Sequence, residues 1–413
     1  MKFYAAYFGC RTNQAEMQEW IDRLEGSGYE LTSRVTEAEF GILHTCCVTE
    51  KAERDVHRFI RSVYKNTRIR WFVTGCAVTN GKAALGERYK NFIFLDNAEK
   101  ERLAETITEA FPLTSHIIYH SAFKSRIFLK IQDGCNFRCA FCIVPRLRGK
   151  SRSLKPEIIR EKAARFAALG YHEIVLTGIN LSSYGYDLHP RQTLLSLLET
   201  LQKLEAIDIL RLSSLDPRFV KYSFVKELSR ISALAPSFHF ALQSGSDSVL
   251  RRMHRGGKAD ENFKILGYFR EFFPDANLGA DIIVGFPGET EKEFADTQAF
   301  IEESPLNYLH IFPFSPRPGT KAECLEPVSA EVMKRRLAVL KEINYRKKID
   351  YREGFKDKVL EGILIEETPH YALMTTRNYL ALRVPPLRGF RKRKIRVRLS
   401  HIVNENLCEG EIV

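Results

Sequence analysis

No stretch of this sequence is a continuous apolar run long enough to cross a membrane. Residues 1–8 read as a strand, and they lack the longer apolar region and the small-residue cleavage site of a secretory signal. We therefore expect a cytoplasmic protein without a membrane partner. Thiols stay reduced in the cytoplasm, so the nine cysteines are expected to be metal ligands, catalytic groups or spare thiols rather than disulfides.

The composition is that of a soluble globular protein, with 44% apolar and 28% charged residues. Because 413 residues exceed the size of one ordinary domain, two or three domains are expected. The formal net charge of +12 favours a polyanionic partner. On charge alone, a nucleic acid and an anionic membrane surface both fit, and so does a mildly basic protein with no such partner.

Three cysteines lie close together directly after the apolar, strand-like residues 127–131. Cys135, Cys139 and Cys142 are separated by three and then two residues, and on a loop this spacing can turn their thiolates towards one point. A four-iron cluster normally takes four cysteine thiolates, so three would leave one iron open to another ligand. The alternative is a zinc site, although the second cysteine pair or histidine pair of common zinc motifs does not follow closely.

Strand-like and helical patterns divide the chain into three parts. Residues 1–115 alternate short apolar runs with helical patterns, which predicts a flavodoxin-like α/β domain with a parallel sheet. Within residues 116–347, six successive β/α units predict a partial (β/α)6 barrel, followed by a connecting helix. Period-two patterns in residues 348–413 predict a small all-β, OB-like module.

Further cysteines follow three of the N-terminal strand-like runs: Cys10, the pair Cys46 and Cys47, and Cys76. Since the carboxyl ends of parallel strands meet at one edge of a sheet, three of these thiols would gather there as a second metal site. Ordinary buried free cysteines are the alternative. Adjacent strand residues point to opposite faces, so Cys46 and Cys47 are not expected to bind a metal together.

Glycine-rich or polar segments follow the predicted barrel strands, where the chemistry of such barrels is located. Glycine there allows the backbone to approach a ligand closely, although each segment taken alone can be only a turn. The segments are residues 177–178, 213–214, 243–245, 285–288 and 313–320.

The C-terminal module contains a dense basic run without an acidic residue. In a strand, Arg396 and Arg398 would share one face, and the aliphatic residues between them the other. A basic face on a small barrel predicts contacts with nucleic-acid phosphates, and a solvated charged face is the alternative. The expected RNA-binding residues are Arg388, Arg391, Lys392, Arg393, Lys394, Arg396 and Arg398.

These features together resemble the methylthiotransferase family of the radical S-adenosylmethionine (SAM) superfamily. His44 stands where this family commonly has asparagine, and residues 254–257 depart from the usual segment. The segments that carry the resemblance are residues 9–14, 45–49, 74–76, 135–149, 175–178, 211–214, 242–247, 281–289 and 314–320.

The resemblance implies SAM and two [4Fe-4S] clusters. Cys135, Cys139 and Cys142 would hold the cluster that binds SAM, and Cys10, Cys46 and Cys76 would hold an auxiliary cluster. A radical made from SAM would remove hydrogen from an adenine, the auxiliary cluster would present sulfur, and a second SAM would methylate it. The resemblance also implies that residues 1–115 are the methylthiotransferase domain, 116–347 the radical SAM core and 348–413 an RNA-binding TRAM module. The residues expected to contact SAM are Phe141, Gly178, Gln243 and Gly285.

The family has branches that differ in substrate. Residues 9–14 and 176–185 are most similar to the branch that adds a methylthio group to C2 of N6-threonylcarbamoyl-adenosine beside the anticodon of tRNA. The expected partners are tRNA, an external electron donor and a sulfur source. The alternatives are isopentenyl-adenosine in tRNA, an aspartate of a ribosomal protein, and a non-enzymatic iron–sulfur protein that binds RNA.

Overall fold

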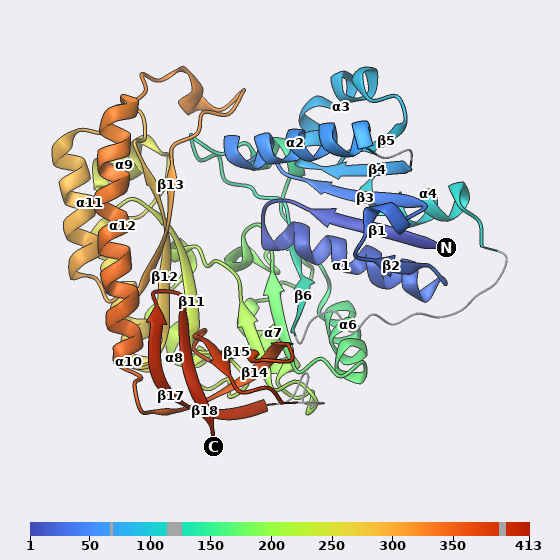
Figure 1. Ribbon diagram of the computed structural model, residues 1–413. Helices are drawn as coiled ribbons and strands as arrows, with labels where there is room; N and C mark the ends of the chain where they lie inside the picture. Colours follow the sequence, from blue (N-terminus) through green and yellow to red (C-terminus); the bar gives the residue numbers. More distant parts are fainter. Residues whose placement is uncertain (67–68, 114–125, 388–393) are drawn as a thin grey trace.

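The computed structural model describes residues 1–66, 69–113, 126–387 and 394–413 (Figure 1). The N-terminal domain (blue) and the C-terminal barrel (red) are attached to different ends of a central domain. Among the described residues, no helix is both long and apolar enough to span a membrane. The mixed α/β class expected from the sequence is confirmed.

The N-terminal domain is built on one parallel sheet. Its strands are β1 (Lys2–Tyr7), β2 (Glu30–Thr32), β3 (Phe40–Thr45), β4 (Arg70–Gly75) and β5 (Phe92–Leu95). They lie in the order β2-β1-β3-β4-β5, which is the flavodoxin-like order, and every residue of β3 is buried. The helical elements are α1 (Arg11–Gly26), η1 (Val35–Glu37), α2 (Glu50–Asn66), α3 (Cys76–Arg88), η2 (Lys100–Arg102) and α4 (Leu103–Ala110).

The central domain is an open barrel of six parallel strands. These are β6 (Arg126–Lys130), β9 (Glu173–Thr177), β10 (Ile209–Leu212), β11 (Ser237–Gln243), β12 (Asn277–Val284) and β13 (Tyr308–Pro313). Sheets β10-β9-β6 and β11-β12-β13 are joined by bridges such as Leu215 to Phe240. Among the described strands, β6 pairs only with β9 and β13 only with β12, so the barrel stays open between them.

Helices and short turns connect the barrel strands and bury its outer surface. Apolar side chains from strands and helices, such as Ile174, Leu210, Phe238 and Leu266, form one continuous core. The connecting elements are β7 (Gln132–Asp133), α5 (Val144–Arg148), β8 (Arg152–Ser153), α6 (Pro156–Ala168), η3 (Leu181–Ser183), α7 (Leu194–Leu201), η4 (Pro217–Phe219), α8 (Tyr222–Leu228), α9 (Asp247–Arg252), α10 (Ala259–Phe272), α11 (Glu291–Glu303) and η5 (Lys321–Cys324).

The C-terminal module is a small closed barrel reached through the long helix α12 (Ala330–Glu353). Its strands are β14 (Val359–Glu367), β15 (Ala372–Thr376), β16 (Ala381–Val384), β17 (Lys394–Asn404) and β18 (Leu407–Ile412). It contacts the amino ends of the central strands, where Arg377 Nη2 donates to the Ser232 carbonyl oxygen at 2.7 Å. The cysteines that follow the strands of the first two domains therefore lie at the opposite, carboxyl end of the central barrel from this module.

Candidate active site

A cavity of about 680 Å³ lies between the N-terminal domain and the carboxyl ends of the central strands. Its wall includes residues that follow β1, β3, β9 and β10, and part of the long loop between β7 and α5. The six cysteines expected to hold clusters all line this one cavity: Cys10, Cys46, Cys76, Cys135, Cys139 and Cys142. The structure thus brings together two groups of thiols that belong to different domains.

The N-terminal triplet, Cys10, Cys46 and Cys76, comes from three separate strand ends. Cys10 precedes α1 after β1, Cys46 follows β3, and Cys76 begins α3 directly after β4. Gly9 allows two of these loops to meet, because its φ is +98° and a Cβ there would lie 2.5 Å from the Cys46 Cβ. Burial raises the pKa of the Cys46 thiol to about 12, and the nearby Cys10 and Cys76 thiols add to that rise.

Cys46 and Cys47 are neighbours in sequence, but their surroundings differ. Cys46 lines the cavity, whereas Cys47 is buried in a hydrophobic cluster that includes Leu43, Val56 and Val73. A thiol packed among aliphatic side chains behaves as a small apolar group. Cys46 therefore stays the predicted cluster ligand of this pair.

The central triplet, Cys135, Cys139 and Cys142, lies on one continuous loop. The loop is anchored at its start, where the Cys135 N–H donates to the Gly149 carbonyl oxygen at 3.0 Å. Gly134 makes this path possible, because its φ is +68° and a Cβ there would lie 2.1 Å from the Lys150 carbonyl oxygen. The position of this triplet therefore depends on local chain geometry.

Arg255 contacts the central triplet, although the sequence alone assigned no role to the segment in which it lies. Its guanidinium Nη1 is 3.8 Å from Cys139 Sγ, and its Nη2 is 3.3 Å from Asp216 Oδ2. In the same segment, the Met253 carbonyl oxygen accepts from the Ala140 N–H at 2.8 Å. Residues 253–255 thus contact the cysteine loop from the segment that follows α9, a role that only the folded arrangement reveals.

The donor set fits two iron–sulfur clusters. Each triplet offers three thiols to the same cavity, and the described lining residues include no further cysteine. Thiolates are the ligands that such clusters take, and three per cluster leave one iron for another ligand. A cation stands near each triplet to balance the thiolate charge, Arg255 beside Cys139 and Arg148 beside Cys76.

Three of the four residues expected to contact SAM line the cavity, namely Phe141, Gly178 and Gln243. Gln243 has a φ of +78°, an uncommon conformation for a residue with a side chain, at the point where β11 ends in an irregular pairing. Gly285 lies outside the lining. Its N–H donates to Glu289 Oε2 at 2.9 Å, and a Cβ there would lie 2.7 Å from the Met333 methyl carbon.

A buried charge network joins the two domains behind the cavity. Glu16 of α1 accepts from Lys100 at 2.6 Å, from Lys130 at 2.7 Å and from Arg148 at 3.2 Å, and His44 Nε2 lies 2.7 Å from it. Burial alone would raise the pKa of Glu16, but Arg148, Lys130 and His44 hold it well below its usual range. Residue 44, where this chain has histidine instead of asparagine, thus belongs to the contact that fixes the N-terminal domain on the barrel.

The basic run of the C-terminal module is described only in part. Four of its expected RNA-binding residues, Arg388, Arg391, Lys392 and Arg393, lie outside the described residues. Lys394, Arg396 and Arg398 are exposed on β17, and the aliphatic residues between them are buried, so the predicted alternation is present. Lys394 forms ion pairs of 3.2 Å with Asp208 and with Glu361.

Comparison with known proteins gives two family matches and several relatives. Residues 129–301 match the Radical SAM superfamily, and residues 2–95 match a family described as uncharacterized protein family UPF0004. A threonylcarbamoyladenosine tRNA methylthiotransferase, MtaB of Aquifex aeolicus, is 32% identical and covers 93% of this chain and 96% of its own. The protein of the same name from Thermotoga maritima is 34% identical over 84% of each chain. A tRNA-2-methylthio-N(6)-dimethylallyladenosine synthase of Pelotomaculum thermopropionicum is 29% identical over 82% of this chain and 81% of its own.

Two solved structures share the fold. The radical S-adenosylmethionine methyltransferase TsrM from Kitasatospora setae, with cobalamin and a [4Fe-4S] cluster bound, has a TM-score of 0.55 at 11% identity. This match covers 78% of this chain and 76% of TsrM. The cobalamin-dependent S-adenosylmethionine radical enzyme OxsB has a TM-score of 0.52 at 14% identity, over 83% of this chain and 56% of its own. At these identities the likeness concerns the fold alone.

Proposed function

Because the chain belongs to the tRNA methylthiotransferase family of radical SAM enzymes, we propose that it adds a methylthio group to C2 of N6-threonylcarbamoyladenosine beside the anticodon of tRNA. The protein is a transferase, and its cofactors are SAM and [4Fe-4S] clusters. One observation carries the proposal: two cysteine triplets from two domains line a single cavity. An enzyme that both removes hydrogen and inserts sulfur at one carbon needs this arrangement.

The residues of the chain have distinct tasks in this proposal. When bound, SAM and the clusters supply radical hydrogen abstraction, sulfur and the methyl group. Cys135, Cys139 and Cys142 hold one cluster, and the N-terminal triplet holds the other. Phe141, Gly178 and Gln243 contact SAM, and Arg255 keeps the cysteine loop in place. The N-terminal domain covers the strand ends and so excludes water from the reacting groups.

The proposal extends to partners and location. The substrate is a tRNA, and the exposed cations of β17 contact its phosphates. An external electron donor and a source of sulfur are required, because the chain itself supplies only ligands. A cytoplasmic protein fits these needs.

Dimethylallyladenosine in tRNA, also called isopentenyl-adenosine, is the second candidate substrate. It is favoured by the relatives named as synthases of its 2-methylthio form, which are 29% to 30% identical to this chain. The two candidates share the adenine and differ in the substituent on N6, which is an amino acid joined through a ureido group in one and an apolar branched chain in the other.

Nucleoside mass spectrometry of tRNA tests the proposal. In cells that lack the protein, 2-methylthio-N6-threonylcarbamoyladenosine should disappear and its precursor without the methylthio group should accumulate. Supplying the wild-type gene should restore the product, and supplying the Cys46→Ala variant should not. Loss of only the dimethylallyl product would assign the second candidate substrate instead.

A further inference from the structure

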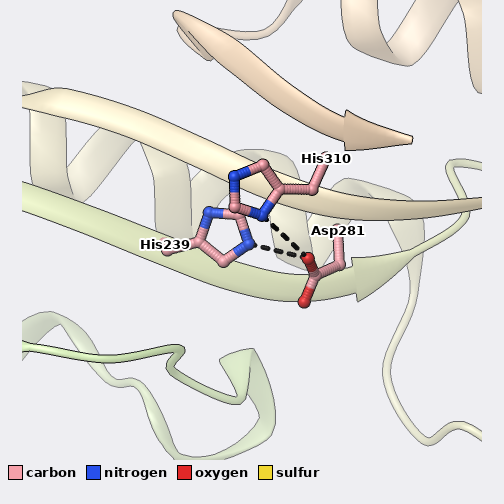
Figure 2. A group of neighbouring side chains, drawn as sticks. All are labelled: His239, Asp281 and His310. Carbon is pink, nitrogen blue, oxygen red and sulfur yellow. Dashed lines mark hydrogen bonds and ion pairs between the residues drawn. The ribbon is translucent and has the colours of Figure 1, made fainter. Parts of the chain in front are cut away.

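Three titratable side chains form a cluster in the wall of the same cavity, and none belongs to the two cysteine triplets (Figure 2). His239, Asp281 and His310 come from the adjacent strands β11, β12 and β13. Asp281 is the register partner of His310, and the two imidazole rings are 4.4 Å apart. Figure 2 shows both rings turned towards one carboxylate oxygen: His239 Nε2 lies 2.9 Å and His310 Nδ1 3.5 Å from Asp281 Oδ1.

Tyr308 sets the orientation of this cluster. Its ring lies over Gly279, where a Cβ would be only 2.0 Å away, and its hydroxyl is 3.1 Å from His239 Nδ1. Burial raises the pKa of Tyr308, and burial lowers that of His239 although Asp281 acts in the opposite direction. With a neutral imidazole that donates from Nε2 to Asp281, the Tyr308 hydroxyl donates to Nδ1.

This arrangement leaves two polar atoms for a ligand. Asp281 Oδ1 is the oxygen that both histidines approach, and Oδ2 has no hydrogen-bond partner among the described residues. His310 uses Nδ1 towards Asp281, which leaves Nε2, and half of its side chain is exposed. The cluster thus presents a carboxylate oxygen, which accepts from N–H groups, next to an imidazole nitrogen.

Arg11 supplies a cation to the same cavity from the N-terminal domain. It lies in the first turn of α1 beside Cys10 and lines the cavity wall. It shares the cavity wall with His239, Asp281 and His310, and its charge is among those that act on the pKa of His239 and of Tyr308. In the described part of the chain, no carboxylate forms an ion pair with it, and its guanidinium carbon lies 5.9 Å from the centre of the Tyr379 ring.

A carboxylate oxygen and a guanidinium together match a ligand with N–H donors and a carboxylate of its own. An amino acid joined to the adenine through a ureido group has both features. A branched apolar substituent has neither. It would bury Asp281 and Arg11 without offering either of them a polar partner, and burying charged groups without a partner is strongly unfavourable. On the basis of the proposed function, we propose that Asp281, His310 and Arg11 form the subsite that binds the ureido-linked amino acid of the substrate adenine and rejects an apolar substituent.

Synthetic anticodon stem-loops with three different N6 substituents test this subsite. One carries the threonylcarbamoyl group, the second an alkylcarbamoyl group that keeps the ureido N–H groups but has no carboxylate, and the third a dimethylallyl group. For each we would measure kcat/KM for methylthiolation and, separately, the Kd by fluorescence anisotropy. The wild type should prefer the first, then the second, and should bind the third weakest.

The Arg11→Gln variant should impair the reaction and binding of the threonylcarbamoyl stem-loop only. It should lower kcat/KM and affinity for the threonylcarbamoyl stem-loop by roughly 10- to 100-fold, the range for a hydrogen bond to a charged group. Its effect on the alkylcarbamoyl stem-loop should be within about 2-fold, because that ligand has no carboxylate to lose. Arg11→Lys should recover part of the loss. Arg23→Gln, on the exposed part of the same helix, is the matched control. It should change neither kcat/KM nor affinity for the two ureido stem-loops.

Asp281→Asn and His310→Phe should weaken the binding of both ureido stem-loops to the same extent. They should therefore reduce the ratio of affinity for these two stem-loops to affinity for the dimethylallyl stem-loop. Iron content per chain shows whether each variant is assembled. If Arg11→Gln weakens all three stem-loops equally, or none, the subsite is wrong. It is also wrong if elemental analysis finds a stoichiometric metal other than iron that Asp281→Asn removes, since the three ligand atoms lie within 4.8 Å of one another. A wild type without activity on the threonylcarbamoyl stem-loop would instead overturn the proposed function.

Discussion

The two cysteine triplets line the same cavity but are assembled in opposite ways. Cys135, Cys139 and Cys142 lie within eight residues of one loop, whose path is set by Gly134 and by the bond from Cys135 to Gly149. The N-terminal triplet joins three strand ends spread over residues 10–76. One triplet therefore depends on local geometry, and the other depends on the packing of a whole sheet and of that sheet on the barrel.

The largest expected effect is loss of the central triplet. Replacing Cys135, Cys139 and Cys142 together with alanine should abolish SAM cleavage, because no thiolate is left to hold that cluster. Iron analysis of the reconstituted wild type should give about eight irons per chain, as for two cubes, and the variant about four. Cys324→Ala is the control, since Cys324 is exposed and lies outside the cavity lining. About four irons in the wild type would contradict the two-cluster interpretation.

Cys46→Ala breaks the N-terminal triplet without touching the central one. Methylthio transfer should be lost while SAM cleavage persists, because the two clusters have separate ligands. Cys47→Ala is the matched control: it removes only a small buried side chain, which should cost about 1 kcal/mol of stability. Product analysis and SAM cleavage, measured on the same preparations, check both. If the two variants exchange phenotypes, the ligand is Cys47.

Both triplets could be predicted from the sequence, for different physical reasons. The spacing of the central one is local, and the strand-end position of the other follows from the rule that parallel strands end at one edge. The charge network behind them could not be predicted. Glu16 and Arg148 are 132 residues apart, and only the docking of α1 on the barrel brings them together.

The polar cluster in the cavity wall was also beyond prediction, although its strands were located correctly. His239 lies in β11, where nearly every residue is buried, so no alternation of polar and apolar residues marks the inward face. The irregular pairing between Phe240 and Gln243 shifts the register as well. Gly285, for which the resemblance implies contact with SAM, lies outside the cavity lining and beside Met333 of α12, and its contact with SAM stays a prediction.

Glu16→Gln should affect the two triplets unequally, because it weakens the contact between the N-terminal domain and the barrel. Removing the carboxylate leaves Lys100, Lys130 and Arg148 with Asp133 as their one shared carboxylate among the described residues, which should lower the free energy of unfolding by about 3–5 kcal/mol. Methylthio transfer should fall more than SAM cleavage, because the N-terminal triplet depends on this contact for its place on the barrel, whereas the central loop is also held by the hydrogen bond from Cys135 to Gly149. Glu19→Gln is the control on the same helix, where a partly exposed ion pair with Lys162 contributes at most about 1 kcal/mol. Equal loss of both activities would mean that the network supports the whole cavity.

Acid should weaken the same contact in a defined range. Burial would raise the pKa of Asp133, but Arg148, Lys100 and Lys130 hold it at about 2, below its ordinary value of 3.8. A depressed carboxyl pKa stabilises the folded state above the unfolded pKa, and this contribution is lost as the pH falls from about 4 to about 2. The loss should be on the order of 2 kcal/mol, and Asp133→Asn should lack this part of the pH dependence. The free energy of unfolding of the wild type and of Asp133→Asn is measured at each pH. Because acid damages the clusters of both proteins alike, the difference between the two values isolates the contribution of Asp133. If the unfolding free energies of the two proteins change with pH in parallel, Asp133 is not the titrating group.

The smallest expected effect concerns the surface far from both triplets, where a lysine in ion pairs can be compared with two arginines that form none with the described residues. Arg396 and Arg398 are exposed on β17, whereas Lys394 already forms ion pairs with Asp208 and Glu361. Neutralising both arginines to glutamine should weaken the binding of many tRNAs alike, because interactions with phosphates position RNA without reading its sequence. The slope of log affinity against log salt should become shallower by roughly 0.7–0.9 for each phosphate that the variant no longer neutralises.

Lys394→Gln should change that slope less than half as much as the double arginine substitution, since a lysine that is paired with two carboxylates has little charge left for a phosphate. Lys292→Gln, an exposed lysine of α11, is the control and should leave binding unchanged. Filter binding over a range of salt concentrations measures all four proteins. If the double arginine variant binds tRNA normally at every salt concentration, this strand is only a solvated face. The RNA-binding surface would then have to include Arg146, Lys150 and Arg152 but not Arg148, which is buried in the network with Glu16 and Asp133.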